Sequence, residues 1–436
     1  MRKILGTILF MLCLSMQTQA KVYEHTQGNR LTLLEDPAAA VDYKVELIKK
    51  AKHHINIITF FWDDTNVPKR LAEELNKANA RGVEIRVLST FISTIGVDFF
   101  GQGRKELDPT TDAVFAYLQL TPGTQFSLTH SLHEKIFLVD GELAILGGRN
   151  ISDSSLSGKD MEVELRGPVV NQVQDHFKRM FDFIVGQKIQ TNCASDETTK
   201  CEDSYKRMIF SENDKHFFPV QPAYEDGDEA RILSHEAVLH QFEKGMNRRE
   251  RLLQQDDILD TVTKIDFKKL RAYNYFMIPT KRYRDFLEKN LKEGDSIEII
   301  TNSLESAKFS NNAGYIYSLP DARQLVLDGI ELYQWQRNQK LNYVHEKVLI
   351  FDEDHVIIGS HNFGTGSTSV SNEIAVEIKS KRIASRLIEV FEGEKENSAI
   401  TKKADVELLD KEISQHERLI EIYRSKILGS VLREIY

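Results

Sequence analysis

The stretch HEKIFLVDGELAILGGRN spans residues 133–150, and HEKVLIFDEDHVIIGSHN at residues 345–362 repeats its pattern. The shared positions are His133, Lys135, Asp140, Gly147, Gly148 and Asn150 in the first copy, and His345, Lys347, Asp352, Gly359, Ser360 and Asn362 in the second. Most residues between these positions change only within the apolar class. A common fold explains repeated apolar residues, but repeated His, Lys and Asn indicate a common chemical task.

Each copy of the repeat is expected to form a two-stranded hairpin. In the first copy, the apolar runs 135–139 and 143–147 are joined at Asp140–Gly141, a dipeptide typical of tight hairpin turns. Asp140 and Asp352 stand at the two joins, so we predict a structural role for both. Because side chains alternate along a strand, the His and Lys of each copy point to one face, where packing alone poorly explains them.

Both copies follow a similar alternation of strands and helices. The expected strands are 53–62, 83–89 and 124–128 before the first copy, and 271–279, 295–303 and 330–335 before the second. The expected helices are 67–82 and a stretch near 112–120 in the first half, and 281–294 and a stretch near 321–328 in the second. This alternation predicts an α/β fold with two halves, each a mainly parallel sheet covered by helices.

The length of 436 residues allows two or three domains, or one large unit with two lobes. Arg2 and Lys3 precede an uncharged apolar run, and small residues end at Ala20, as is typical of a secretory signal peptide. We therefore expect an exported protein, either periplasmic or secreted. The predicted boundaries are 1–20 for the signal peptide, 21–186 for the first half, 187–260 for a linker or insertion, 261–380 for the second half and 381–436 for a helical C-terminal segment.

Two cysteines, Cys193 and Cys201, lie close together in the polar segment after the first half. A metal site is disfavoured there, because no histidine or further cysteine lies beside them. An oxidising compartment favours a disulfide between the two residues, and a pair of free thiols is the alternative.

Two copies of the motif that face each other across a pseudo-twofold axis bring two imidazoles, two ammonium groups and two amides into one site. Lysine and asparagine donors suit the oxygens of a phosphate. One histidine can attack phosphorus while the other protonates the leaving alkoxide and later takes a proton from the incoming water or alcohol. The lysines supply the positive charge, so we expect no metal and no other cofactor.

Each motif histidine is followed at nearly the same distance by a carboxylate, Asp160 in the first copy and Glu373 in the second. A carboxylate bonded to one ring nitrogen fixes the tautomer of a histidine and steadies its protonated form. Asp160 and Glu373 are therefore candidates to orient the histidines. Ordinary surface salt bridges are the alternative for both residues.

These residues resemble the phospholipase D superfamily, whose signature HxKx4Dx6G(G/S)xN occurs in two copies. The resemblance covers most of residues 45–380 and implies two phospholipase D-like halves with the active site at their interface. It implies that His133 is the nucleophile and His345 the general acid and base. Lys135, Lys347, Asn150 and Asn362 would then bind the phosphate. Residues 301–306, 312–315, 329–335 and 359–367 are similar to the bacterial cardiolipin synthase branch, in which phosphatidylglycerol exchanges with a second phospholipid or an alcohol.

The sequence departs from the family at two places. Gly158 and Lys159 stand where a Trp-Arg pair commonly precedes the aspartate, and the arginine usual after the second asparagine is missing. Water and an alcohol therefore both stay open as acceptors. The net charge of −9 disfavours nucleic acid, so we expect a phospholipid substrate and transient contact with a membrane surface. A secreted nuclease of the superfamily and a non-catalytic binding member are the alternatives.

Overall fold

The structure is a computed structural model that describes residues 22–60, 62, 65–89, 116–117, 131–192, 219–237, 257–369 and 371–425. The predicted signal peptide, Cys193, Cys201 and the strand expected at 124–128 lie outside these residues and stay predictions. Within the described ranges, no helix is both long and apolar enough to cross a membrane.

The first half is built around the hairpin of the first repeat. Its strands are β1 (Thr26–Leu34), β2 (His54–Thr59), β3 (Glu84–Ser89), β4 (Ala116–Tyr117), β6 (Ile136–Val139), β7 (Leu143–Gly147) and β9 (Glu162–Arg166). Its longer helices are α2 (Pro37–Lys50), α3 (Asn66–Ala80) and α6 (Val169–Asn192). All residues of β2, β6 and β7 are buried, as expected for strands that are covered on both faces.

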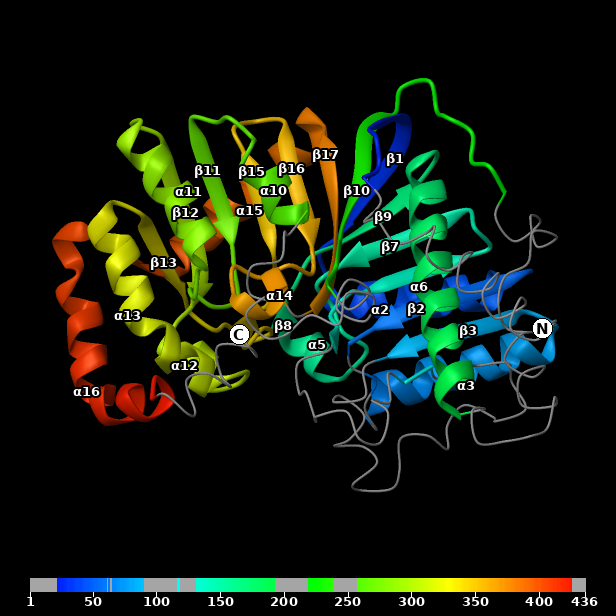
Figure 1. The fold of residues 1–436 in the computed structure, drawn as a ribbon, viewed down its shortest axis with the longest axis horizontal. Coiled ribbons are helices and arrows are strands. Elements are labelled where there is room, and N and C mark those ends of the chain that lie inside the picture. Colours follow the sequence, from blue (N-terminus) through cyan, green and yellow to red (C-terminus); the bar gives the residue numbers. More distant parts are fainter. Residues whose placement is uncertain are drawn as a thin grey trace, which may run out of the picture.

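The second half repeats this construction around the second hairpin. Its strands include β11 (Lys269–Tyr273), β12 (Ser296–Asn302), β13 (Glu331–Trp335), β15 (Val348–Phe351), β16 (His355–Gly359) and β17 (Ser371–Lys379). Its helices include α10 (Asp257–Val262), α11 (Lys281–Lys292), α13 (Asn312–Asp328), α15 (Lys381–Glu396) and α16 (Glu407–Tyr423). Helix α16 lies beside α13 at the outer edge and buries Leu409 and Ile420 (Figure 1).

One continuous sheet joins the halves, in the order β18–β13–β12–β11–β15–β16–β17–β10–β1–β9–β7–β6–β2–β3–β4. Here β10 is Asp228–Glu236 and β18 is Ser398–Thr401. Outward from the β10–β1 pair the two sides match, with the hairpins β15–β16 and β6–β7 at equivalent places. Figure 1 shows the halves side by side, meeting at β10 and β1. The α/β class with two related halves is therefore confirmed.

Strand pairing in this sheet is mixed rather than mainly parallel, which corrects our expectation. Parallel pairing in the main sheet is found in the runs β2–β3–β4 and β11–β12–β13, whose strands are linked through helices where the connections are described. The repeat strands pair antiparallel with each other and with their neighbours. A tight hairpin turn reverses the chain and so dictates antiparallel pairing.

Three segments differ from the predicted organisation. Strand β10 lies inside the interval 187–260, so this interval contributes a central strand instead of a linker alone. Ala116–Tyr117 form β4 beside β3, whereas the sequence predicts a helix near 112–120. A short apolar run is compatible with either structure, so the pattern alone does not distinguish a helix from a strand. Strand β18 pairs with β13, so the C-terminal segment is not entirely helical.

Candidate active site

Two short pairs of parallel strands cross between the halves and bring the motif histidines together. β5 (Ser131–Leu132), directly before His133, pairs with the start of β17. β14 (Tyr343–Val344), directly before His345, pairs with β8 (Gly158–Lys159). The backbone N–H of His133 donates to the carbonyl of Asn372 at 2.9 Å, and that of His345 donates to the carbonyl of Lys159 at 2.7 Å. In each case the residue that accepts this hydrogen bond directly precedes a carboxylate of the other half, Glu373 or Asp160.

The carboxylates exchange partners between the copies. His133 Nδ1 lies 2.9 and 3.0 Å from the two carboxylate oxygens of Glu373, and His345 Nδ1 lies 2.7 Å from Asp160 Oδ2. With Nδ1 engaged, Nε2 is the ring nitrogen of each histidine that can meet a substrate. Asp160 and Glu373 thus take the place beside the histidines that the sequence suggested for them. The spacing along the chain did not reveal that each serves the histidine of the other copy.

The motif lysines lie beside the histidines in both halves. Lys135 Nζ donates to the carbonyl of His133 at 2.6 Å, and Lys347 makes the equivalent hydrogen bond to His345. Both lysine side chains are buried, with about 5% of their surface exposed. Two ammonium groups and two imidazoles therefore gather at one interface, as expected for a phosphate site.

An aromatic ring flanks each His–Lys pair, and sequence reasoning missed both rings. Phe60 meets the ring of His133 edge-on at 5.1 Å and lies 5.5 Å from Lys135 Nζ. Tyr275 meets the ring of His345 edge-on at 4.8 Å and lies 5.4 Å from Lys347 Nζ. Phe60 and Tyr275 follow the equivalent strands β2 and β11, so they are counterparts that differ by one hydroxyl. Nothing in their local sequence distinguishes them from core aromatic residues.

The motif asparagines end each copy with unsatisfied polar atoms. Among the described residues, the Oδ1 atoms of Asn150 and Asn362 are buried and have no hydrogen-bond partner. Buried polar atoms are otherwise almost always paired. These Oδ1 atoms are acceptors that a hydroxyl group or a water can satisfy, whereas a phosphate oxygen would need the amide N–H groups of the same side chains.

Burial sets the protonation states of the site. It lowers the pKa of His133 and of His345 to about 4, although the partner carboxylates act in the opposite direction. Burial also lowers the pKa of Lys135 to about 7 and that of Lys347 to about 8. Near neutral pH both imidazoles are therefore neutral, and the lysines release protons far more readily than exposed lysines do.

The carboxylates stay ionised despite their burial. Burial alone would raise the pKa of Asp160, but His345 and then Lys347 lower it overall. Burial alone would likewise raise the pKa of Glu373, but His133 and then His361 and Lys135 together lower it overall. Both residues are therefore charged acceptors that hold a proton on Nδ1 of their histidines.

The aspartates at the hairpin joins act on the backbone. Asp140 and Asp352 both have φ of 52°, a left-handed conformation that aspartate tolerates better than most residues. The carboxylate of Asp140 accepts hydrogen bonds from the backbone N–H groups of Lys52, His53 and His54 at the start of β2. Asp352 likewise accepts from the two residues that lead into β11. Both thus tie the motif hairpin to the neighbouring strand.

The small residues of the motif make room for the carboxylates. A Cβ at Gly148 would lie 2.3 Å from Asp160 Oδ1, so any larger residue there would displace the Asp160 carboxylate. A Cβ at Gly147 or Gly359 would lie 2.3 or 2.4 Å from a backbone carbonyl oxygen of the adjacent strand. Ser360, the counterpart of Gly148, instead donates a hydrogen bond from its hydroxyl to Glu373.

The two departures from the family have structural counterparts. After Asn362, where the usual arginine is missing, Ser367 of α14 (Thr365–Ser369) donates to Glu373 Oε1 at 2.5 Å. Lys159 Nζ lies 3.3 Å from both Glu346 and Glu394, so it forms ion pairs with two carboxylates of the second half. Neither replacement removes a histidine, lysine or carboxylate of the site.

Asn302, within the segment 301–306 that resembles cardiolipin synthases, holds β14 in place. Its side chain donates to the carbonyl of Val344 at 2.8 Å and accepts from the N–H of Val344 at 2.9 Å. Val344 directly precedes His345. The fully buried Asn302 therefore fixes the backbone that carries one catalytic candidate.

Comparison with known proteins agrees with this geometry. The family described as the phospholipase D-like domain of cardiolipin synthase matches residues 45–181 and 265–395. Cardiolipin synthase C of Escherichia coli strain K12 is 25% identical over 80% of this chain and 81% of its own length. Cardiolipin synthase 1 of Staphylococcus epidermidis is 22% identical over 87% of this chain and 70% of its own length.

A solved structure shows the same fold. The phosphatidylserine synthase of Haemophilus influenzae covers 93% of this chain and 95% of its own, with a TM-score of 0.64 at 12% identity. Both segments matched by the family contain one motif copy with its hairpin, and together they span more than half of the chain. The chain therefore belongs to the phospholipase D-like family of cardiolipin synthase and is an enzyme of the phosphodiesterase and phosphatidyltransferase class.

Proposed function

We propose that this protein cleaves a phospholipid through a phosphohistidine intermediate and passes the phosphatidyl group to an alcohol or to water. The observation that supports this most is the reciprocal pair of His–carboxylate contacts, His133 with Glu373 and His345 with Asp160, beside two buried lysines. One imidazole is needed to attack phosphorus and another to exchange a proton with the alcohol oxygen. Two oriented imidazoles at one phosphate site fit both requirements.

In the first step, His133 Nε2 attacks phosphorus and the bond between phosphorus and the leaving oxygen breaks. His345 gives a proton from Nε2 to that oxygen, so the alcohol leaves neutral. The negative charge of a bound phosphodiester raises the pKa of His345, which favours the protonated form needed here. Lys135 and Lys347 stabilise the charge on the phosphate oxygens. We assign the nucleophile to His133 by resemblance to the family.

In the second step, the acceptor loses its proton to His345 as its oxygen attacks phosphorus. The bond between phosphorus and His133 Nε2 breaks, and the enzyme returns to its first state. Glu373 keeps the Nδ1 proton of His133 in place throughout, so Nε2 is always the reacting nitrogen. An alcohol acceptor gives a new phosphodiester, and water gives phosphatidic acid.

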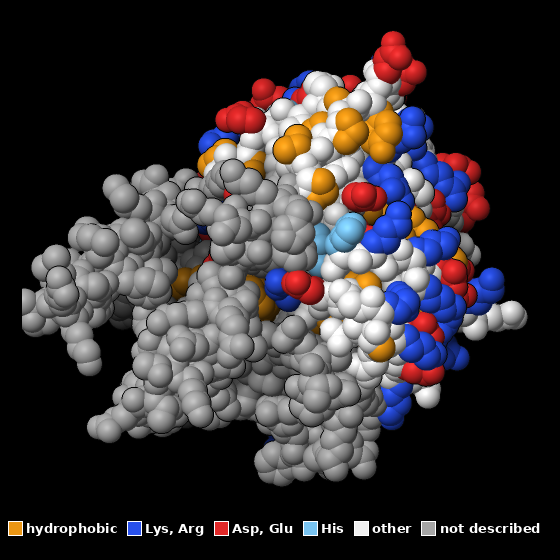
Figure 2. Space-filling model, turned by 90° about the vertical axis from the view of Figure 1, so that its right-hand side faces the viewer, with side chains coloured by type: hydrophobic (Ala, Val, Ile, Leu, Met, Phe, Trp, Pro, Cys, Tyr) orange, Lys and Arg blue, Asp and Glu red, His pale blue; other side chains and the backbone are white. Residues whose placement is uncertain are grey.

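The surface supports a lipid over nucleic acid as the substrate. On the described part of the face in Figure 2, Lys and Arg side chains lie among Asp and Glu side chains. Exposed ion pairs of the first half, such as Arg70 with Asp42 and Lys77 with Glu73, have this mixed character. Nucleic-acid binding normally uses a surface on which positive charges predominate. Export remains part of the proposal, supported by the leader-like run at residues 1–20.

The decisive experiment is to incubate the purified protein separately with phosphatidylglycerol vesicles, phosphatidylcholine vesicles and DNA, in EDTA and without added metal. Lipid turnover with intact DNA supports the proposal. Cleavage of DNA with intact lipid replaces it with a nuclease, and inertness towards all three substrates favours a binding protein. Turnover that requires a divalent ion contradicts a site whose charge comes from lysines.

A further inference from the structure

Lys159 is the first-half residue that directly precedes Asp160, the carboxylate beside His345. Its backbone carbonyl accepts a hydrogen bond from the N–H of His345 at 2.7 Å. Its side chain forms an ion pair with Glu346, the residue after His345, with 3.3 Å between Lys159 Nζ and Glu346 Oε1. Two consecutive residues of the first half therefore hold two consecutive residues of the second half.

The ammonium group of Lys159 lies among groups of the second half. It is 3.3 Å from Glu394 Oε1 on α15 and 5.5 Å from the centre of the Tyr273 ring on β11. The indole N–H of Trp335 on β13 donates to the other oxygen of Glu394 at 2.5 Å. The Lys159 side chain is 10% exposed, so a charged side chain of the first half is largely buried against the second half.

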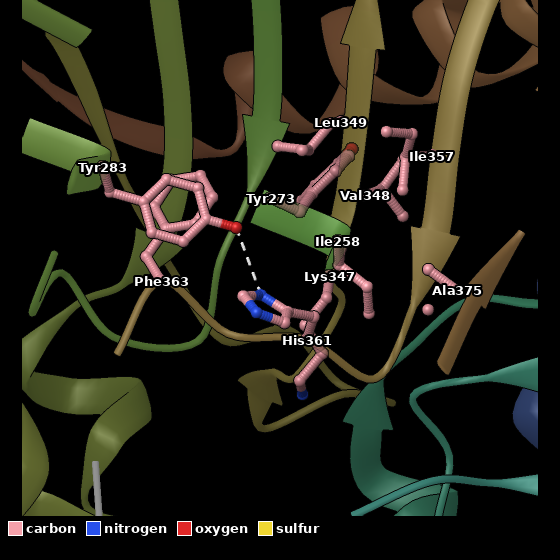
Figure 3. Close-up of a pocket in the computed structure, with 11 residues that line it drawn as sticks. Ile258, Tyr273, Tyr283, Lys347, Val348, Leu349, Ile357, His361, Phe363 and Ala375 are labelled. Carbon is pink, nitrogen blue, oxygen red and sulfur yellow. Dashed lines mark hydrogen bonds between the residues drawn. The ribbon is translucent and has the colours of Figure 1, made fainter. Parts of the chain in front are cut away.

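Tyr273 connects this ion pair with the site. Tyr273 and Lys347 both line the small pocket that is drawn in Figure 3. Lys347 is a motif lysine and follows Glu346 directly in the chain. The aromatic ring that lies beside the Lys159 ammonium is therefore also part of the wall next to a phosphate-binding candidate.

The charge of Lys159 balances two buried or largely buried carboxylates. Burial alone would lower the pKa of Lys159, but Glu346 and Glu394 together raise it. Glu346 is 1% exposed, and within the described ranges its second oxygen, Oε2, has no hydrogen-bond partner. A buried carboxylate that loses its positive partner is strongly destabilised. Removal of the Lys159 ammonium is therefore expected to displace Glu346 from its place beside His345.

The first copy of the motif is built differently at this place. The counterpart of Lys159 is Asn372, whose neutral side chain cannot form an ion pair. The counterpart of Glu346 is Glu134, which lies 3.0 Å from the Nε2 atom of His176 in its own half. The charged contact that Lys159 makes across the interface is therefore a feature of the second motif.

We propose that Lys159 is a positioning residue for His345. Its ion pair with Glu346 keeps the Asp160 carboxylate aligned with the histidine ring. The proposal rests on the proposed function in that His345 is the general acid and base. Proton transfer requires close alignment, so a displacement of about 1 Å slows it by about 100-fold. The nucleophile His133 has its own carboxylate and depends much less on Lys159.

The test compares Lys159→Met, which removes the charge, with Lys159→Arg, which keeps it. Turnover of phosphatidylglycerol needs an acid for the leaving alcohol, whereas formation of the phosphohistidine from a p-nitrophenyl phosphodiester does not. In Lys159→Met, the first rate should fall by about 100-fold and the second by about threefold or less. Lys159→Arg should keep the ratio of the two rates close to that of the original protein.

Lys395→Met is the matched control. Lys395 also bridges two carboxylates, Glu298 at 3.1 Å and Glu392 at 2.9 Å, but all three residues belong to the second half. Removing its charge measures the effect of losing such an ion pair without losing a contact across the interface. The two rates should keep their ratio in this variant.

NMR of the full chain with labelled histidine supplies a measurement that does not depend on turnover. The Nδ1 proton of each motif histidine faces a carboxylate, which slows its exchange with water. In Lys159→Met, the Nδ1 proton of His345 should exchange about tenfold faster or more, while that of His133 keeps its original rate. A general loosening of the fold would accelerate both.

Three results overturn the proposal. They are an unchanged His345 with unchanged lipid turnover in Lys159→Met, equal slowing of both reactions in that variant, and the same selective loss in Lys395→Met. Thermal melting identifies a variant that fails to fold. In that case the double variant with Glu346→Gln decides, since it removes the unpaired charge of Glu346. Persistent loss of lipid turnover in the folded double variant supports the proposal, and full recovery would show that Lys159 serves folding alone.

Failure of the proposed function gives a different result. If the Nδ1 proton of His345 exchanges faster in Lys159→Met as expected, but the original protein turns over no phospholipid, the proposed function fails and the positioning role stands.

Discussion

Glu373 lies 2.9 and 3.0 Å from His133 Nδ1, although the two residues belong to opposite halves of the chain. Asp160 and His345 form the reverse pair at 2.7 Å. Neither half by itself holds a motif histidine together with the carboxylate that orients it, so the site exists only when the halves are docked. The strand pairs β5–β17 and β14–β8 maintain this docking directly beside the site.

A single site built from both copies predicts that His133→Ala and His345→Ala each reduce turnover of phosphatidylglycerol by about 1,000-fold or more. The double variant should be scarcely worse than either single variant, because both residues serve one reaction. The measurement is lipid turnover at matched protein concentration and equal melting temperature. Half of the activity surviving in either single variant would show that the copies are independent sites.

The pairing of Glu373 with His133 and of Asp160 with His345 predicts different effects for the two carboxylates. With an activated phosphodiester, Glu373→Gln should slow formation of the phosphohistidine by about 100-fold or more, because the nucleophile loses its orientation. Asp160→Asn should leave this first step largely intact, because the leaving group needs no acid. Acid quenching and detection of labelled phosphate on His133 measure the step. The opposite ranking, or label on His345, would reverse the assignment of the two histidines.

Much of this site could be predicted from the sequence because its residues recur in a fixed pattern. His133, Lys135, His345 and Lys347 lie directly before equivalent hairpins, and the two halves meet as the repeat implies. The exchange between the copies could not be predicted, because it depends on how two separate halves dock. Local periodicity carries no information about such contacts between distant residues.

Other features of the structure could not be predicted from the sequence for a similar reason. Strand β10 is flanked by polar sequence, yet it lies at the centre of the sheet because β1 and β17 cover its two edges. Phe60 and Tyr275 look like core aromatic residues until the strands place them beside the histidines. Ser367 belongs to no position of the repeated motif, yet it donates a hydrogen bond to Glu373.

The contrast between Gly148 and Ser360 predicts that the copies do not tolerate each other's residue equally. Gly148→Ser places a Cβ where Asp160 Oδ1 lies, so Asp160 must move and turnover should fall by about 100-fold. Ser360→Gly removes one hydrogen bond to Glu373 and should cost about tenfold or less. Steady-state turnover of both variants tests this ranking. Equal losses would show that the space beside Asp160 does not matter.

The lowered pKa values of Lys135 and Lys347 predict how kcat/KM depends on pH on the alkaline side. Lys135 and Lys347 lose their charge as the pH rises through about 7 and about 8, respectively. Since the charged form binds the phosphodiester, kcat/KM should fall by about tenfold or more per pH unit above pH 8. Lys347→Arg should remove the upper of these transitions. A kcat/KM that still rises at pH 9 would contradict the phosphate-binding role of the lysines.

The last prediction concerns the choice between water and an alcohol as acceptor. Transfer requires that the site bind an alcohol in line with phosphorus, since water would otherwise reach the phosphohistidine first. The buried Asn302 and Ser306 are engaged in hydrogen bonds within the protein, so the segment 301–306 shapes the site more than it binds a headgroup. The residues of α14 are all small, so this helix brings no bulky apolar side chain that would exclude water near Glu373. We therefore expect transfer together with appreciable hydrolysis.

With phosphatidylglycerol as substrate, the share of transfer product should rise with added glycerol while phosphatidic acid continues to form. If phosphatidic acid is the sole product at every glycerol concentration, the protein is a hydrolase.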